Sequence, residues 1–292
     1  MSRRGWALFI SLGVIWGLPY LLIKVGVDSL SPFVVVFARV FIGAAILLPI
    51  AFFTGQLRKL KGHWRWVFIF AIVEMTFTFL ALTWAEQSIS SSLAALLIST
   101  VPLTAAIIAR AMGLDSRLSG MRLVGLGVGF AGVAALVGLD VSGGDFLSVA
   151  AISITVLGYS LGPIIVDRKL SSAPSVAVIA ASLTINALIY APFAWLTWPT
   201  EPVPANAWWS IVALGAVCTA GAFIIFFALI AEVGPARTTV ITYVNPGVAV
   251  ILGVLILGEP LTPGIVIGFP LVLAGSFLAT RRAPTMESEP HA

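Results

Sequence analysis

The stretch Thr242–Leu261, TYVNPGVAVILGVLILGEPL, is apolar over most of its length but contains Asn245-Pro246 and closes on Gly258-Glu259-Pro260. Apolar runs of about 20 residues match the roughly 30 Å hydrocarbon core of a bilayer when they are helical. We assign the stretch to a span at about 236–257, which places Pro246 near the middle. A proline there frees a backbone carbonyl, so the stretch predicts a membrane helix that borders protein or a water-filled cavity at that depth.

The composition places the whole chain in the membrane. Of 292 residues, 60% are hydrophobic and 10% are charged, and the mean hydropathy is +1.09; these are too few polar groups for a water-exposed surface. The sequence lacks the alternating ten-residue strands of a membrane β-barrel. Membrane topology explains the net charge of +4, and no basic run is long enough to indicate nucleic acid. The single cysteine, Cys218, has no disulfide partner in the chain. We expect an all-α polytopic membrane protein.

Hydropathy, with Gly, Pro and charge clusters as boundaries, predicts ten spans. They are residues 6–26, 32–53, 66–85, 90–110, 119–139, 147–166, 175–197, 208–230, 236–257 and 263–280. With a cytoplasmic N-terminus, fourteen of the sixteen Lys and Arg residues fall on the cytoplasmic side, all except Lys24 and Arg39. Both termini are therefore predicted to be cytoplasmic, in a bacterial cytoplasmic or inner membrane. The first helix is expected to be retained, because no small-residue cleavage site follows it.

The two halves of the chain match each other in order. A shift of 144 residues aligns Pro19 with Pro163, Lys24 with Arg168 and Pro102 with Pro246, and a shift of 143 aligns Gly125 with Gly268 and Gly132 with Gly275. This predicts a first five-helix domain at 1–140, a second at 141–282 and a disordered cytoplasmic tail at 283–292. Because five is odd, the second copy enters the membrane from the opposite side. Inverted repeats of this kind are typical of secondary transporters with a site near the midplane.

Three stretches resemble the drug/metabolite transporter superfamily, in its ten-helix form with two EamA-type domains. They are VIWGLPYLLIKVG, SSLAALLISTVPL and ARTTVITYVNPGVAVILGVLILGEPLTPGIVIGFPLVLAGSFL. The last is the most specific, with a Pro in the ninth helix, a Leu-Gly-Glu-Pro turn at Glu259 and a Gly-containing tenth helix. The chain departs from the pattern where MGLDSRLS replaces the first-half turn and where Glu74 interrupts the third span. The resemblance implies transport; members include exporters of amino acids and other metabolites, uptake systems and sugar-phosphate exchangers.

Three charged residues lie in the predicted spans away from their cytoplasmic ends. Glu74 is about 13 Å deep at 1.5 Å per residue, where an ionised carboxylate costs about 2.5 to 3.5 kcal/mol. It either binds a substrate ammonium or couples transport to protons, or it is protonated and only hydrogen-bonds a neighbouring helix. Lys24 can extend its ammonium to the interface. Arg39 is deeper and needs a partner, either a structural one such as Glu86 or a substrate carboxylate.

Other deep polar, aromatic and helix-breaking residues complete the predicted site. The predicted substrate-binding residues are Trp16, Tyr20, Glu74, Thr78, Ser99, Thr100, Tyr159, Tyr243 and Asn245, and the predicted hinges are Pro19, Pro102, Pro163 and Pro246. Asn186 lies at a similar depth. The glycines of LVGLGVGFAGVAAL, including Gly125, Gly129 and Gly132, share one helical face, as do their counterparts Gly264, Gly268 and Gly275. Such faces permit close helix packing, either within one chain or at a dimer seam.

The function expected from the sequence is secondary transport. We predict alternating access and export of amino acids or similar metabolites, with aromatic or other apolar amino acids as candidates. Multidrug or cationic-amphiphile efflux is the first alternative, and a channel or an intramembrane enzyme comes after it. Both histidines lie outside the spans and no HExxH motif occurs, so an enzyme is not expected. We expect no cofactor and no metal. The expected partners are a small-molecule substrate, candidate coupling protons and lipid, with a monomer favoured over a dimer.

Overall fold

A computed structural model describes residues 1–113, 120–140, 145–234 and 238–280. All regular structure in these residues is helical. Within these described ranges, nine helices are long and apolar enough to cross a membrane, and a shorter apolar helix, Pro263–Ala279, follows them. This confirms the predicted integral membrane protein, and the observed spans agree with the ten expected ones to within a few residues. The expected tail at 283–292 lies outside the described residues.

The ten spans are built from the following elements. In order they are α1 (Arg3–Val27); α2 (Pro32–Phe53); α3 (Trp64–Phe70), η2 (Ala71–Thr76) and α4 (Phe77–Ala85); α5 (Ser91–Ile98) and α6 (Val101–Ala111); α7 (Gly120–Asp140); α8 (Phe146–Ile165) and η3 (Val166–Leu170); α9 (Ser175–Leu196); α10 (Ala205–Gly215), η4 (Ala216–Gly221) and α11 (Ala222–Val233); η5 (Thr239–Tyr243) and α13 (Asn245–Leu257); and α14 (Pro263–Thr280). A short 3₁₀ helix, η1 (Gln56–Leu60), precedes α3.

Local sequence sets several helix ends. Ser2, Ser31 and Ser90 are N-caps whose hydroxyls accept from the main-chain N–H of Gly5, Val34 and Leu93, as Ser is favoured to do. Gly258 ends α13 in the left-handed conformation, at φ 67°, where a side chain would be strained.

The interruptions within spans are the main departure from ten continuous α-helices. The segments η2 and η4 are π-helical and occupy the middle of the third and eighth spans. The fourth span breaks at Ser99-Thr100 and the ninth at Val244. Interruptions of the helical ladder at membrane depth must be satisfied by neighbouring protein or by water.

The structure places Pro102 and Pro246 differently from the expected kinks inside continuous helices. Each lies in the first turn of a new helix, α6 or α13. Proline is favoured there because the first-turn N–H groups have no helical acceptor. Thus the helix is interrupted before each proline and not at it. Both prolines remain near the middle of their spans, as the sequence predicted.

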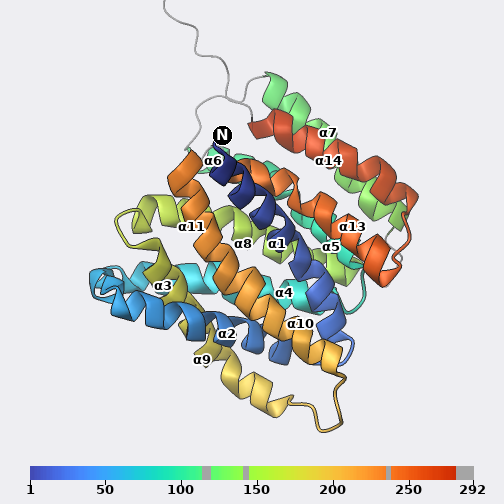
Figure 1. The fold of residues 1–292 in the computed structure, drawn as a ribbon. Helices are drawn as coiled ribbons and strands as arrows, with labels where there is room; N and C mark the ends of the chain where they lie inside the picture. The colour runs from blue at the N-terminus through green and yellow to red at the C-terminus, as the bar shows by residue number, and fades with distance from the viewer. Residues whose placement is uncertain (114–119, 141–144, 235–237, 281–292) are drawn as a thin grey trace, which may run out of the picture.

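Helices from the two halves lie side by side throughout the bundle. Figure 1 shows α7 and α14 packed along each other at one edge, with α1, α10 and α11 crossing the front; α2 also packs extensively on α9. Two large apolar clusters fill the interior, one around α1, α5 and α8 and the other around α2, η2 and α9. Tyr159 of α8 and Phe37 of α2 pack against both clusters, so they mark the boundary between them.

Hydrogen bonds tie the connections together at each end of the bundle. At one end, called the Lys24 end, the Lys24 ammonium donates to the carbonyls of Glu86 and Ile89, and Ser31 bonds Thr197. At the opposite, N-terminal end, Ser2 bonds Glu232 and His63 bonds Ser172.

Candidate functional site

Glu74 and its neighbours pack closely against two glycines of α8, Gly158 and Gly162, which we call the glycine seat. Glu74 belongs to the π segment η2. A Cβ placed on Gly162 would overlap the Glu74 carboxyl. A Cβ placed on Gly158 would overlap Thr78 and the Val73 carbonyl. Small residues four positions apart allow this close approach. The Glu74 Oε2 atom is buried and lacks a hydrogen-bond partner among the described residues. The hydrogen-bonding capacity of this oxygen is therefore unused among the described residues in this conformation.

Side chains of α9 hydrogen-bond to the π segment η2. Asn186 is fully buried; its Nδ2 donates to the Ala71 carbonyl at 3.2 Å, and its Oδ1 accepts from Thr76 Oγ1 at 2.7 Å. The Tyr190 hydroxyl donates to the Thr76 carbonyl. In the sequence, Asn186 stood out only by its depth in the span. In the structure its side chain satisfies polar groups of η2, the segment that contains Glu74. The signal for this role was a deep amide in an otherwise apolar span.

Arg39 of α2 contacts the π segment η4. Its Nε donates to Thr219 Oγ1 of η4 at 3.1 Å, and its guanidinium carbon lies 3.9 Å from the centre of the Phe79 ring. The Nη1 atom is buried and has no partner among the described residues. Between two described residues, the one ion pair within 4.0 Å is Arg4–Glu232. The expected direct pairing of Arg39 with Glu86 is therefore not formed in this conformation.

Two tyrosines interact with these charged groups. Tyr159 contacts Phe79 edge to face at 6.5 Å and interacts electrostatically with Arg39, Glu74 and Glu86. Tyr20 of α1 interacts electrostatically with Tyr159, Glu86 and Arg39. The structure thus brings together the predicted residues Tyr20, Glu74 and Tyr159. We call these three, with Arg39, the central cluster.

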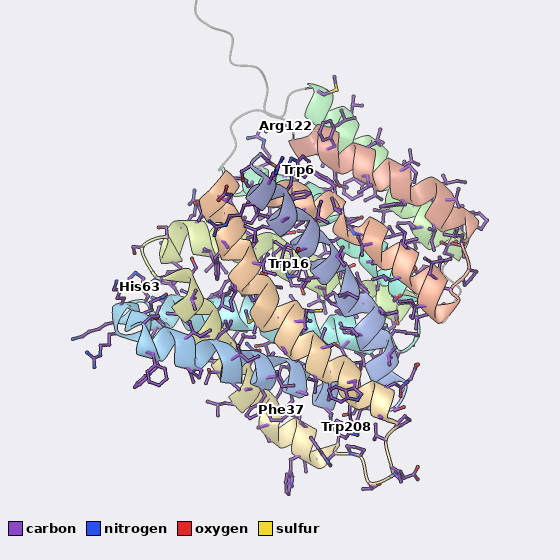
Figure 2. All side chains as sticks on the ribbon, viewed as in Figure 1. Trp6, Trp16, Phe37, His63, Arg122 and Trp208 are labelled. Atoms are coloured by element: carbon purple, nitrogen blue, oxygen red, sulfur yellow. The ribbon has the colours of Figure 1, made fainter. Side chains whose placement is uncertain are left out.

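Trp16 forms a separate aromatic group beside this cluster. Its ring lies 5.0 Å from Phe226 and 6.4 Å from Phe223, both on α11. Figure 2 shows Trp16 near the middle of the bundle, whereas Trp6 and Trp208 lie toward its ends. Trp16 is partly exposed in the middle of its span, and its role as a wall residue stays a prediction.

The remaining predicted site residues donate hydrogen bonds to main-chain carbonyls. The Ser99 and Thr100 hydroxyls donate to the carbonyls of Leu96 and Leu97, each at 2.6 Å. Thr78 donates to the Glu74 carbonyl, so it supports the π segment. Tyr243 donates to the Ser276 carbonyl of α14 at 3.3 Å. With its amide oriented to satisfy both groups, Asn245 donates to the carbonyls of Gly13 and Ile241.

The prolines of the first and sixth spans lie inside helices. Pro19 is buried within α1, close to Tyr20, and Pro163 lies within α8 next to Gly162 and shortly before the π segment η3. Pro19 is therefore next to Tyr20 of the central cluster, and Pro163 is next to Gly162 of the glycine seat. Interior prolines bend helices, so these positions are suitable hinges.

The Leu-Gly-Glu-Pro turn has a defined role at the Lys24 end. The Glu259 carboxylate accepts from the main-chain N–H groups of Ser91 and Ser92 at 2.7 and 3.0 Å and from Ser92 Oγ at 2.5 Å. This arrangement, the Glu259 cap, joins the second half to the first turn of α5. The sequence identified the motif but not its partner, which lies far away in the chain. The corresponding MGLDSRLS stretch is outside the described residues from 114 to 119.

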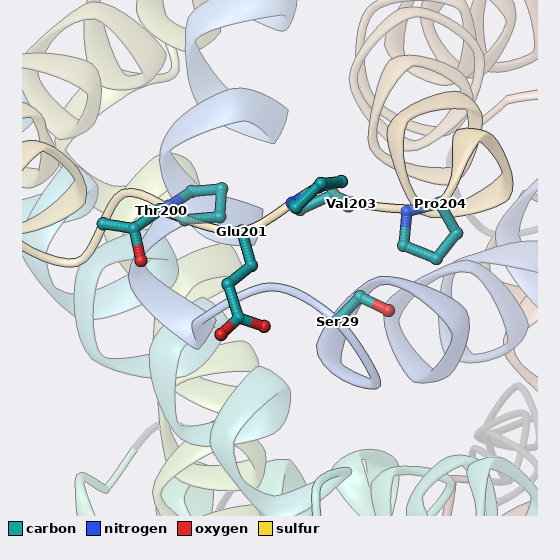
Figure 3. Close-up of a pocket in the computed structure, with 7 residues that line it drawn as sticks. Ser29, Thr200, Glu201, Val203 and Pro204 are labelled. Carbon is teal, nitrogen blue, oxygen red and sulfur yellow. The ribbon is translucent and has the colours of Figure 1, made fainter.

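Two pockets lie away from the predicted site. One, of about 300 Å³, is lined by Ser29 and residues 199–204, at the loop between α9 and α10 (Figure 3). Another, of about 330 Å³, is apolar and lies between α2 and η1. Neither includes a predicted substrate-binding residue. In this conformation, then, neither of them is the shared central void that the sequence predicted.

Comparisons with known proteins agree with this architecture. The model of the EamA-like transporter family matches residues 3–138 and again 146–281. The uncharacterized inner membrane transporter YedA of Escherichia coli (strain K12) is 30% identical over 265 residues, which cover 88% of this chain and 83% of YedA. A probable terminal-alkyne amino-acid exporter of Streptantibioticus cattleyicolor is 25% identical over 290 residues, covering 97% and 95%. A crystal structure at 21% identity has a TM-score of 0.68 and covers 96% of this chain and 98% of its own, a likeness of fold.

Proposed function

The chain belongs to the EamA-like transporter family, and from this premise we propose that it is a secondary carrier that exports amino acids by alternating access. Aromatic or other apolar amino acids are the favoured substrates. One similar protein is named as a probable amino-acid exporter, which supports this class. The membrane is taken to be the bacterial inner membrane, as the name of YedA states for that relative.

The observation that carries the proposal is the unpartnered carboxyl oxygen of Glu74 beside Tyr159. A carboxylate at membrane depth requires a cation or a proton. A substrate ammonium supplies the first, and a proton replaces it when the substrate leaves. Tyr20, Tyr159 and Trp16 provide apolar surface for a side chain. The buried Arg39, with its free Nη1 atom, favours substrates that also carry a carboxylate over purely cationic amphiphiles.

We further propose that residues 1–140 and 141–282 are inverted repeats. The π segments Ala71–Thr76 and Ala216–Gly221 differ by 145 positions, close to the shift found in the sequence. The same shift places Glu74 opposite Thr219, the residue that Arg39 contacts. The family model also matches each half separately. Two similar bundles around one site are a common arrangement among alternating-access transporters.

The orientation is proposed from charge. The distribution of Lys and Arg puts the N-terminal end in the cytoplasm and the Lys24 end outside. In a strain carrying the full chain, a cysteine at Glu201 should react with a membrane-impermeant maleimide added to intact cells, and one at Ser2 should react only after lysis. The opposite pattern would reverse the direction of transport inferred here.

Reconstituted protein tests both substrate class and coupling. We expect counterflow with a panel of radiolabelled amino acids to be saturable and greatest for bulky apolar ones. Glu74→Gln should abolish accumulation driven by a pH gradient but keep exchange at saturating substrate, because exchange needs no proton cycle. Its half-saturation concentration should rise roughly 10- to 100-fold, the loss of one hydrogen bond to a charged group.

The matched control is Glu232→Gln, which removes an acid that bonds Ser2 and Arg4 at the N-terminal end. It should leave both measurements unchanged. Unaltered pH-driven flux in Glu74→Gln would remove Glu74 from coupling. Flux that does not saturate would indicate a channel and not a carrier.

A further inference from the structure

A second acidic residue, Glu86, is enclosed at the Lys24 end. It follows α4 directly, at the C-cap position. Its exposure is 0%, and both carboxyl oxygens are buried without a hydrogen-bond partner among the described residues. Protein atoms, and not lipid, enclose this carboxyl. An ionised carboxylate in such a place is costly unless it is paired.

The charged groups around Glu86 are already engaged. The Lys24 ammonium donates to the Glu86 and Ile89 main-chain carbonyls at 2.7 and 3.1 Å. The Arg39 guanidinium is held by Thr219 and Phe79. The Glu259 carboxylate is held by α5, and its charge opposes ionisation of Glu86. The remaining titratable neighbours, Tyr20 and Tyr159, interact with Glu86 but do not neutralise it.

These contacts favour the neutral form of Glu86. Burial raises the pKa of Glu86 well above its ordinary value; Lys24 lowers it, Glu259 raises it and Arg39 lowers it. The cations attract the carboxylate from outside hydrogen-bonding distance, whereas burial acts on it directly. Burial is the largest of these influences, so the carboxyl holds its proton while the Lys24 end is closed.

We propose that Glu86 is a second proton-binding site of this carrier, filled while the Lys24 end is closed and emptied when that end opens to water. The inference rests on the proposed alternating access, but not on the substrate or on coupling through Glu74. Opening would hydrate the carboxyl, which then loses its proton to the solvent. The closed conformation thus binds one proton more than the open one at this residue.

The sign of the pH dependence follows from this difference. Below the ordinary pKa of a glutamate, about 4.3, Glu86 is neutral in both conformations and opening is unaffected by it. As pH rises above that value, ionisation is possible only in the open form, so the open fraction grows by about tenfold per pH unit. The growth stops when pH passes the raised pKa of the closed form.

A cysteine reporter can measure this opening without a substrate. Ser91 has 0% exposure and its hydroxyl has no partner among the described residues, so Ser91→Cys in a Cys218→Ala chain is a suitable reporter of the closed end. The full chain in lipid nanodiscs would be labelled with a maleimide between about pH 4.5 and 8.5, a range that begins near the ordinary pKa of a glutamate. Denatured protein gives the fully labelled reference.

Comparison with Glu86→Gln removes the pH dependence of the thiol itself. We expect the ratio of the labelling rate in the reporter parent to that in Glu86→Gln to rise by tenfold or more across this range. Glu86→Asp, which keeps a titratable group, should retain the rise, and Glu201→Gln, an exposed acid in the loop after α9, should not change it. The aspartate variant also provides a test if the amide variant does not fold.

Three results would overturn the proposal. They are a ratio that stays flat with pH, a reporter that is never labelled in folded protein, and labelling that increases as pH falls. Failure of the Glu74 flux assay alone would leave this result standing, and failure here would leave the proposed substrate class standing.

Discussion

Glu259 illustrates what a single side chain contributes to this fold. Its carboxylate receives three hydrogen bonds at the start of α5, where unsatisfied N–H groups and the helix dipole favour a negative charge. Gly253 permits this contact, because a Cβ there would overlap both the carboxylate and Ser92 Oγ. The sequence alone supplied the Gly-Glu-Pro motif, but a partner some 167 residues away in the chain leaves no local pattern.

Replacing Glu259 with Gln should weaken the Lys24 end. The amide has one acceptor oxygen and no charge, so at least one main-chain N–H loses its partner. We expect the free energy of unfolding to fall by about 2 kcal/mol, measured by denaturant titration in micelles. The Ser91→Cys reporter should also be labelled faster at every pH. Glu201→Gln is the matched control and should change the free energy by less than about 0.5 kcal/mol; an equal loss in both variants would contradict a specific role for the cap.

Gly162 makes a second prediction at the same scale. A methyl group there overlaps the Glu74 carboxyl, so Gly162→Ala should displace Glu74 and abolish pH-driven flux, with a loss of about 1 to 3 kcal/mol from overpacking. In a double-mutant cycle, Glu74→Ala should recover much of this stability but none of the flux. Gly127→Ala on α7, where a Cβ meets nothing within 4 Å, should be neutral or stabilising. Independent, additive effects of the two changes would disprove the contact.

At the scale of elements, the spans were predictable and their interruptions were not. Hydropathy located all ten spans, since bilayer thickness fixes their length, and proline marked where the fourth and ninth spans break. The π segments have no such mark. They depend on partners such as Asn186, which accepts from Thr76 and donates to Ala71. Sequence depth also placed Tyr243 and Asn245 at the site, but it could not predict the hydrogen bonds that they make to the backbone of α14, α1 and η5.

Asn186→Ala should therefore destabilise η2 and disturb Glu74 indirectly. The substitution removes three buried hydrogen bonds, two of them to η2 and one to the Ser182 carbonyl of α9, and we expect a loss of about 1 to 3 kcal/mol together with a higher half-saturation concentration in counterflow. Thr184→Ala, two residues away on α9, removes only a bond to the Ala180 carbonyl of the same helix. It should change both quantities little. Equal effects would mean that the damage lies in α9 itself and not in the π segment.

At the scale of the whole molecule, the glycine faces explain how α7 and α14 pack so closely. A Cβ on Gly132 would overlap the main chain at Val272 and Gly268, and one on Gly275 would overlap the main chain of Gly129. The sequence left open whether these faces pack within one chain or form a dimer seam; in the structure they pack within one chain. Gly264 differs, because its N–H donates to the Asp140 carboxylate at 3.1 Å.

This packing predicts a monomer whose stability depends on the glycine faces. Because each face is covered by the other, Gly132→Leu should lower the free energy of unfolding by about 3 kcal/mol or more, beyond the usual range for overpacking, since backbone must move. Light scattering and native mass spectrometry should find a monomer before and after the change. Gly138→Leu, on the same helix but with open space around it, controls for the added bulk. The contrary result would be an unaltered protein that is a dimer and that Gly132→Leu separates into stable monomers. The glycine face would then join two chains, and the pairing of α7 with α14 inside one chain would be wrong.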